Sequence, residues 1–140
     1  MKIHFVDSNI FYYHLLQDKV HGPRATGIIG RIRDGEAAAT SVIVISELIS
    51  LFEFRIMQTH KRVDLSLGEK KYITERFERS TSDCHDLITS LVHLEKLDCT
   101  SDDALNAFTY RSKYRLGFND AINLAVMERN NISDIYSFDK

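Results

Sequence analysis

The chain has 140 residues, of which 44% are apolar and 27% are charged, and its formal net charge at pH 7 is −2. This length and composition predict one globular domain spanning residues 1–140, and they exclude a disordered chain. No apolar run approaches the roughly 20 residues that a membrane-spanning helix needs, and the N-terminus reaches Asp7 without a signal-peptide apolar region, so we expect a cytoplasmic protein.

Short apolar runs alternate with amphipathic segments along the chain, and turn or capping residues separate them. Residues 42–45 are β-branched, but Ser41 is a good N-cap and the apolar spacing continues to Ile56, which favours a helix. In chain order we expect a strand at 2–6, a helix at 10–17 capped by Ser8-Asn9, a helix at 24–33, a strand at 37–40, a helix at 42–60, a helix from the capping box at 66–69 to 79, a helix starting at Ser82-Asp83, a strand at 97–100, a helix at 101–114, a helix at 120–129 capped by Asn119, and a strand at 135–138.

This alternation predicts an α/β fold, a three-layer sandwich with a central parallel sheet flanked by helices. Ligands of such folds gather outside the carboxyl ends of the strands. Asp7 ends the first strand, Asp139 ends the last, Asp120 opens a helix after a turn, and Glu47 lies early in the long helix. Each acid alone has an ordinary structural explanation, as a turn residue, a solvated helix residue, a helix N-terminal acid or a terminal residue.

Four segments around these acids resemble, in the same order, the four motifs of the PIN-domain family. Together they span nearly the whole chain. The segments are residues 6–11 (VDSNIF), 40–41 (TS) with 45–48 (ISEL), 116–122 (LGFNDAI) and 135–139 (IYSFD).

The resemblance implies a Rossmann-like, Mg²⁺- or Mn²⁺-dependent ribonuclease, closest to VapC-type toxins and related single-domain PIN proteins. It also implies a homodimer and, for a toxin, a small antitoxin partner; a housekeeping nuclease is equally compatible. The family usually continues past its fourth acid, whereas this chain ends at Lys140. By motif position the catalytic and metal-binding residues would be Asp7, Glu47, Asp120 and Asp139, supported by Ser8, Asn9, Ser41 and Ser137.

The acidic set has a chemical rationale apart from the family. Carboxylates brought close together repel, so they must take up protons or share a cation. Mg²⁺ and Mn²⁺ prefer such oxygen ligands, and a bound ion activates water for attack on phosphate without a Ser, Cys or His nucleophile. The six histidines lack zinc-site spacing with cysteine or with each other, and Cys84 and Cys99 are expected to be free thiols.

Two stretches, 55–62 and 108–118, carry basic residues and no acid, although the net charge of the chain argues mildly against nucleic-acid binding. Their cations could follow an RNA backbone or form an ordinary solvated helix face. Among the aromatic residues, Phe52, Phe54, Phe77 and Phe108 are expected in the core, whereas Tyr110 and Tyr114 could stack on bases. The candidate RNA-binding residues are Arg55, Arg62, Arg111, Lys113 and Arg115, with Lys61 beside them.

Two other functions fit parts of the sequence. A PIN-type RNA- or protein-binding module, or an RNA-processing factor, would not cut RNA; the intact acidic set argues against it. Phosphoryl transfer through an aspartyl-phosphate at Asp7 would need a second acid beside the first, and the following residues are Ser8 and Asn9. Endonucleolytic hydrolysis of RNA is therefore the leading hypothesis.

Overall fold

The computed structural model describes residues 2–60 and 65–139. The described strands form a four-stranded parallel sheet in the order β3-β2-β1-β4. Phe5 of β1 pairs with Ala39 of β2 on one side and with Ile135 of β4 on the other. The strands are β1 (His4–Val6), β2 (Ala38–Ser41), β3 (Leu94–Leu97) and β4 (Asp134–Tyr136).

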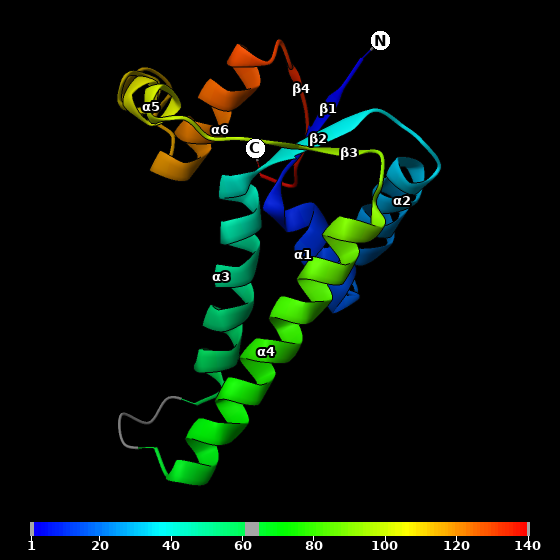
Figure 1. The fold of residues 1–140 in the computed structure, drawn as a ribbon, viewed down its shortest axis with the longest axis vertical. Coiled ribbons are helices and arrows are strands. Elements are labelled where there is room, and N and C mark those ends of the chain that lie inside the picture. Colours follow the sequence, from blue (N-terminus) through cyan, green and yellow to red (C-terminus); the bar gives the residue numbers. More distant parts are fainter. Residues whose placement is uncertain (1, 61–64, 140) are drawn as a thin grey trace.

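Helices cover both faces of this sheet, which confirms the predicted α/β sandwich. Along the chain the sheet grows from β1 to β2 to β3 and then returns to β4 beside β1. Right-handed crossovers place helices on one face during the outward run and on the other during the return. Figure 1 shows α5 and α6 on one side and α1, α2 and α4 on the other. The helices are α1 (Ser8–Leu16), α2 (Gly22–Arg33), α3 (Val42–Gln58), α4 (Leu67–Ser90), α5 (Ser101–Tyr114) and α6 (Phe118–Arg129).

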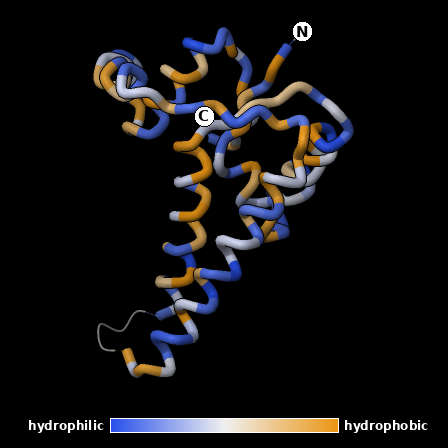
Figure 2. The backbone as a smooth tube through the Cα atoms, in the orientation of Figure 1, coloured by the Kyte–Doolittle hydropathy of each residue, from blue (hydrophilic) through white to orange (hydrophobic). Residues whose placement is uncertain are grey.

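The core forms where the two central strands meet the helices. Phe5 and Val6 of β1 are fully buried, as expected for a strand covered on both faces. Ile28 and Ile32 of α2 and Leu48 of α3 close the core on the face of α1–α4. In Figure 2 the part of α3 nearest the sheet is mostly hydrophobic, whereas α4 carries many hydrophilic residues along its length.

The two helices expected at 66–79 and from Ser82 are a single helix, α4, of 24 residues. The predicted capping box is present at its start, where Ser66 and Glu69 exchange hydrogen bonds. The predicted break at Ser82-Asp83 is wrong because no Gly or Pro interrupts the helix after Gly68, and both residues simply face solvent. Ile73, Cys84, Leu87 and Ile88 are its buried residues, and α4 packs along α3.

Other predicted boundaries differ by a few residues. The predicted strand at 97–100 lies at Leu94–Leu97, because Thr100 instead caps α5 and accepts a hydrogen bond from the Asp103 N–H. The N-cap of α1 is Asp7 and not Ser8-Asn9, and that of α6 is Gly117 and not Asn119. Ser41 caps α3 as predicted, since its Oγ accepts from the Val44 N–H at 3.1 Å.

None of the described helices has both the length and the apolar character needed to cross a membrane. Cys84 and Cys99 are free, which confirms the prediction of unpaired thiols. Burial raises the pKa of the Cys84 thiol to about 11, so this side chain is protonated at neutral pH and contributes to the core.

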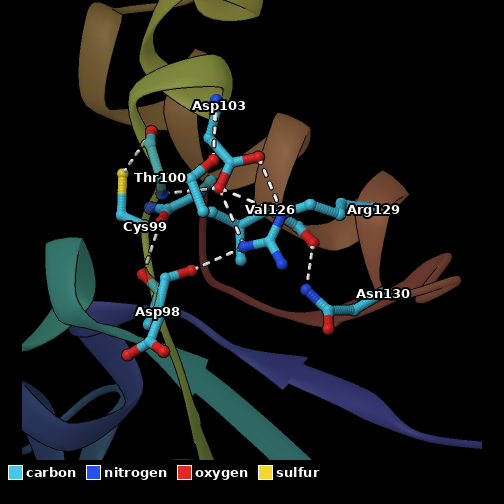
Figure 3. A network of polar contacts seen from close by, with 9 residues as sticks. Asp98, Cys99, Thr100, Asp103, Val126, Arg129 and Asn130 are labelled. Carbon is cyan, nitrogen blue, oxygen red and sulfur yellow. Dashed lines mark hydrogen bonds and ion pairs between the residues drawn. The ribbon is translucent and has the colours of Figure 1, made fainter.

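One charged network joins the start of α5 to the end of α6 (Figure 3). The Asp103 carboxylate is nearly fully buried and accepts from Nε and Nη2 of Arg129, the latter at 2.8 Å. The same carboxylate accepts from the Thr100 N–H, and Arg129 also donates to the carbonyl of Asp98. The Arg129 guanidinium lowers the pKa of Asp103, so the carboxylate is ionised at neutral pH.

We expect Asp103→Ala to lower the free energy of unfolding by about 2–3 kcal/mol, because it removes a buried ion-pair partner and half of a capping box. The loss should be at the lower end of the range for buried pairs since Arg129 keeps contact with solvent. Chemical denaturation measures the change. Asp102→Ala, at the exposed neighbouring position, is the control, and equal losses for both variants would contradict this role of Asp103.

Candidate metal centre

Three acids that are far apart in the sequence meet at the carboxyl end of the sheet. Asp7 follows β1 and caps α1, Glu47 lies in the second turn of α3, and Asp120 lies in the first turn of α6. Each contributes a carboxylate oxygen, and these three oxygens lie within 4.8 Å of one another. From β1 the sheet grows on one side to β2 and β3, and the chain then returns to add β4 on the other side of β1. The carboxyl ends of β1 and β4 therefore flank the topological switch point, where α/β folds bind ligands.

Asp7 is held in place from both of its carboxylate oxygens. Oδ1 accepts a hydrogen bond from the Ser8 N–H at 2.8 Å, and Oδ2 accepts from Ser137 Oγ at 2.9 Å. Its backbone N–H donates to the carbonyl of Tyr136, which continues the pairing of β1 with β4. The side chain is buried, so these bonds fix where its charge lies.

Ser137 links the segment after β4 to α1. Besides donating to Asp7, its Oγ accepts from Asn9 Nδ2 at 3.3 Å and from the Asp139 N–H at 3.1 Å. Asn9 Oδ1 in turn accepts from the Phe138 N–H. The predicted supporting residues Asn9 and Ser137 therefore lie beside Asp7, while Ser8 contacts it through the backbone.

Glu47 is positioned by a polar side chain that the sequence analysis did not identify. Asn123 Nδ2 donates to Glu47 Oε1 at 3.3 Å, and Asn123 Oδ1 accepts from Ser41 Oγ at 2.7 Å. Ser41 thus caps α3 and also orients the amide that reaches the acid. Asn123 lies three residues after Asp120, one helical turn along α6, amid the buried apolar residues Ala121, Ile122, Ala125 and Val126. A polar residue among buried apolar ones was the available signal.

Burial and mutual repulsion raise the pKa values of two of these acids. The pKa of Glu47 rises from 4.5 to about 7, first through desolvation and then through the charges of Asp7 and Asp120. Desolvation and the charges of Asp7 and Asp139 also raise the pKa of Asp120. The site therefore concentrates negative charge beyond what its own hydrogen bonds neutralise.

The fourth predicted acid, Asp139, is exposed and is not one of the three converging residues. Its charge still acts on Glu47 and Asp120, so it lies at the rim of the cluster. The four predicted RNA-binding cations Arg55, Arg111, Lys113 and Arg115 are exposed, and Arg62 and Lys61 lie outside the described residues.

The predictions for the aromatic residues need correction. Phe54 and Phe108 were expected in the core, but 65% and 63% of their surfaces are exposed. Each residue continues the apolar spacing of its helix, but Phe54 is left largely uncovered by the described residues, and Phe108 packs only partly, against Phe118 of α6 with ring centroids 5.0 Å apart. The Tyr110 hydroxyl donates a hydrogen bond to Glu128, which leaves its ring face unassigned, and Tyr114 is exposed; a base-stacking role for both rings stays a prediction.

The donor set of the cluster fits a hard divalent cation. Asp7, Glu47 and Asp120 offer only carboxylate oxygens, the ligands that Mg²⁺ and Mn²⁺ prefer. A cation would also relieve the repulsion that raises the pKa of Glu47. Across residues 2–60 and 65–139, no other group of three or more acids, histidines and cysteines is so arranged.

Comparisons with known proteins agree with this geometry. The family model described as PIN domain matches residues 4–140. Among solved structures, the chain is similar to VapC20 of Mycobacterium tuberculosis, a sarcin–ricin loop cleaving toxin, with a TM-score of 0.67 and 19% identity over 99% of this chain and 90% of that one. No curated protein sequence matches the chain.

Two further structures share the fold. One is a toxin–antitoxin complex from Klebsiella pneumoniae, with a TM-score of 0.54 and 18% identity over 97% of this chain and 86% of that one. The other is VapBC2 from Rickettsia felis, bound to a DNA fragment from its promoter, with a TM-score of 0.58 and 16% identity over 98% and 88% of the two chains. At these identities the likeness concerns the fold.

The raised pKa of Glu47 predicts a pH-dependent change in stability. Between pH 4.5 and about 7 the unfolded chain loses this proton while the folded chain keeps it, so metal-free stability falls as pH rises through that window. Glu47→Gln should remove the effect and raise the free energy of unfolding above pH 7 by about 1–2 kcal/mol, a value reduced for solvent screening of a half-buried group. Below pH 4.5 the two proteins should be equally stable.

Urea denaturation in EDTA at pH 4 and pH 8 tests this expectation. Glu75→Gln, an exposed position on α4, is the control; it keeps Glu47, so its stability should fall between pH 4.5 and about 7 as that of the wild type does. A Glu47→Gln variant that is no more stable than the wild type at pH 8 would show that Glu47 is not under repulsion.

Asn123→Ala should leave the buried Ser41 hydroxyl without its acceptor and Glu47 without its donor. We expect the free energy of unfolding to fall by about 1–3 kcal/mol, the cost of unsatisfied buried polar groups. The pKa of Glu47 should rise further, because the hydrogen bond from Asn123 lowers it. Denaturation and NMR titration measure the two effects, with Asn119→Ala on the exposed side of α6 as the control; an unchanged pKa would exclude the positioning role.

Proposed function

The chain belongs to the PIN-domain family, and from this premise we propose that it is a Mg²⁺- or Mn²⁺-dependent endoribonuclease that hydrolyses RNA phosphodiester bonds. The observation that carries the proposal is the meeting of Asp7, Glu47 and Asp120 with carboxylate oxygens within 4.8 Å. Such a concentration of charge is typical of a site that binds a cation.

Asp7, Glu47 and Asp120 would hold the ion, and Asp139 at the rim would complete the set. When bound, the ion supplies charge neutralisation for the phosphate and activation of the attacking water. The chain's own groups keep the carboxylates in place: Ser8 and Ser137 fix Asp7, and Asn123 fixes Glu47. The free N–H groups in the first turn of α6 lie beside Asp120 and favour an anion such as phosphate.

The RNA backbone would be held by cations near the end of α5. Arg111 and Lys113 lie in the last turn of this helix, and Arg115 caps it in the left-handed conformation, five residues before Asp120. These exposed cations offset the acids locally, which accounts for RNA binding by a chain whose net charge is −2.

The similar solved structures include a toxin and toxin–antitoxin complexes, which supports a role for this chain as the toxin of such a pair with an antitoxin protein as partner. A homodimer is part of the same proposal. Leu105 and Phe108 on α5 expose 64% and 63% of their surfaces, and burying them against a second copy would remove that apolar area from water.

The proposal predicts that cleavage of single-stranded RNA requires Mg²⁺ or Mn²⁺ and is abolished by EDTA, with Zn²⁺ a poor substitute for lack of His or Cys ligands. Asp7→Asn and Asp120→Asn should each reduce cleavage at least about 100-fold, because each removes a ligand while preserving side-chain volume. Cleavage of a labelled oligonucleotide and equilibrium RNA binding are the two measurements.

Asp83→Asn, an exposed position on α4, is the matched control and should cut like the wild type. If the Asn variants still bind RNA but do not cleave it, the acids are needed for cleavage and not for RNA binding. If the Asn variants cut at the wild-type rate, or if purified protein cuts fully in EDTA, the metal-centre assignment is wrong; binding without any cleavage by the wild type would favour a binding module.

A further inference from the structure

A cleft of about 520 Å³ lies between α1 and α3 and opens onto the acidic cluster. It shares Glu47 and Asp139 with the cluster, so a ligand in the cleft would touch the site of the proposed chemistry. The volume is within the usual range for small-molecule sites. The remaining lining comes from α1, from α3 beyond Glu47 and from the start of α6: Ser8, Asn9, Tyr12, Tyr13, Ser46, Ser50, Leu51, Phe54 and Asn119.

One face of α3 forms the long wall of this cleft. Ser46, Glu47, Ser50, Leu51 and Phe54 follow the spacing of three and four residues that places side chains on the same side of a helix. Phe54 lies seven residues after Glu47, about 10 Å along the helix axis. This wall therefore leads from the proposed catalytic acid to a phenyl ring that is 65% exposed.

The facing wall is a pair of tyrosines on α1, Tyr12 and Tyr13, whose rings already pack against other aromatic residues, Phe52 of α3 and Phe138. Phe52 packs edge-on against Tyr12 with ring centroids 4.9 Å apart at 67°. Phe138 does the same for Tyr13 at 5.4 Å and 75°. Because these rings are already packed, a flat ligand entering between α1 and α3 would meet a preformed aromatic surface.

Among the described residues, the lining of the cleft includes no cationic side chain, and its polar groups are neutral apart from the acids at its mouth. Within the described part of the chain, the side chains of Ser46, Ser50 and Asn119 make no hydrogen bond to protein, so their donors and acceptors are available to a ligand. A phosphate would find no positive charge here. A nucleobase would find aromatic faces for its ring and hydroxyl and amide groups for its edge.

We propose that this cleft binds the unpaired base of a nucleotide next to the cleaved phosphodiester, stacked on Phe54 and facing Tyr12. The inference rests on the proposed function, which supplies the single-stranded RNA, and it adds the position of one base and the residues that contact it. A base stacked inside a duplex cannot enter the cleft, so the base site requires an unpaired nucleotide at that position.

The test pairs a protein variant with a substrate variant. An unstructured oligoribonucleotide is first mapped for its cleavage position, and single abasic sites are then placed at each nucleotide around it. Phe54→Ala should lower kcat/KM by roughly 5- to 100-fold, mainly through KM, as expected for loss of one base-stacking contact. Phe54→Trp should retain activity. One abasic position should weaken cleavage by the wild type by a similar factor and have no further effect on Phe54→Ala.

Tyr72→Ala is the control, since this aromatic residue is also exposed but lies on α4, and it should stay within about twofold of the wild type. Equal activity of Phe54→Ala and the wild type, or abasic effects that persist undiminished in Phe54→Ala, would overturn the base site and leave the cleft to a protein segment.

Binding of the same oligonucleotides in EDTA separates this result from failure of the proposed function. If the wild type does not cut but binding still depends on Phe54 and on the same base, the nuclease proposal fails and the base site stands.

Discussion

Three carboxylates that repel one another lie at the end of the sheet, and the surrounding structure must hold them together. Asp7, Glu47 and Asp120 bring negative charge within 4.8 Å, and burial together with the charges of Asp7 and Asp120 raises the pKa of Glu47 to about 7. The fold keeps the acids together because their backbones have little freedom. β1 is paired on both sides, and Thr40 of β2 donates a side-chain hydrogen bond to the carbonyl of Val6, directly before Asp7. Ser41, the next residue, begins the helix that carries Glu47.

Two networks of hydrogen bonds connect neighbouring elements around the acids at the end of the sheet. On one side Ser137 and Asn9 join the end of β4 to α1 around Asp7. On the other, Ser41, Asn123 and Glu47 join α3 to α6 across the sheet end. Each link satisfies buried polar groups that would otherwise destabilise the fold, so the groups that orient the acids also hold the layers together. Positioning of the acids and stability of the domain are therefore expected to change together when one of these residues is replaced.

The sequence was informative where a local pattern determines structure and less so where the tertiary context does. Ser41 and the capping box at Ser66 marked helix starts correctly, because a cap depends on residues within one turn. Ser82-Asp83 has the same composition as a cap but lies within α4, since packing against α3 continues through it. The acids were predicted from motif order and strand ends, whereas Asn123 lies outside the four motifs and is marked in the sequence only as a polar residue among apolar ones. Phe54 was assigned to the core because its spacing fits a buried face, and only the structure shows that the described residues leave this side chain exposed.

The distribution of charge around the acids suggests how one small site could separate the tasks of holding and cutting RNA. Exposed cations follow one another at the end of α5, which leads directly into the turn before Asp120. The cleft on the side of α1 and α3 has aromatic walls, and no cation is among the described residues that line it. A phosphate is anionic and suits the cations of α5, whereas a base is flat and neutral and suits the aromatic cleft. A strand lying with its backbone toward α5 and one base toward α1 and α3 would place the intervening phosphodiester at the carboxylates. The acids would then meet their substrate only when both neighbouring surfaces are occupied, which couples recognition of an unpaired base to the position of the bond that is cut.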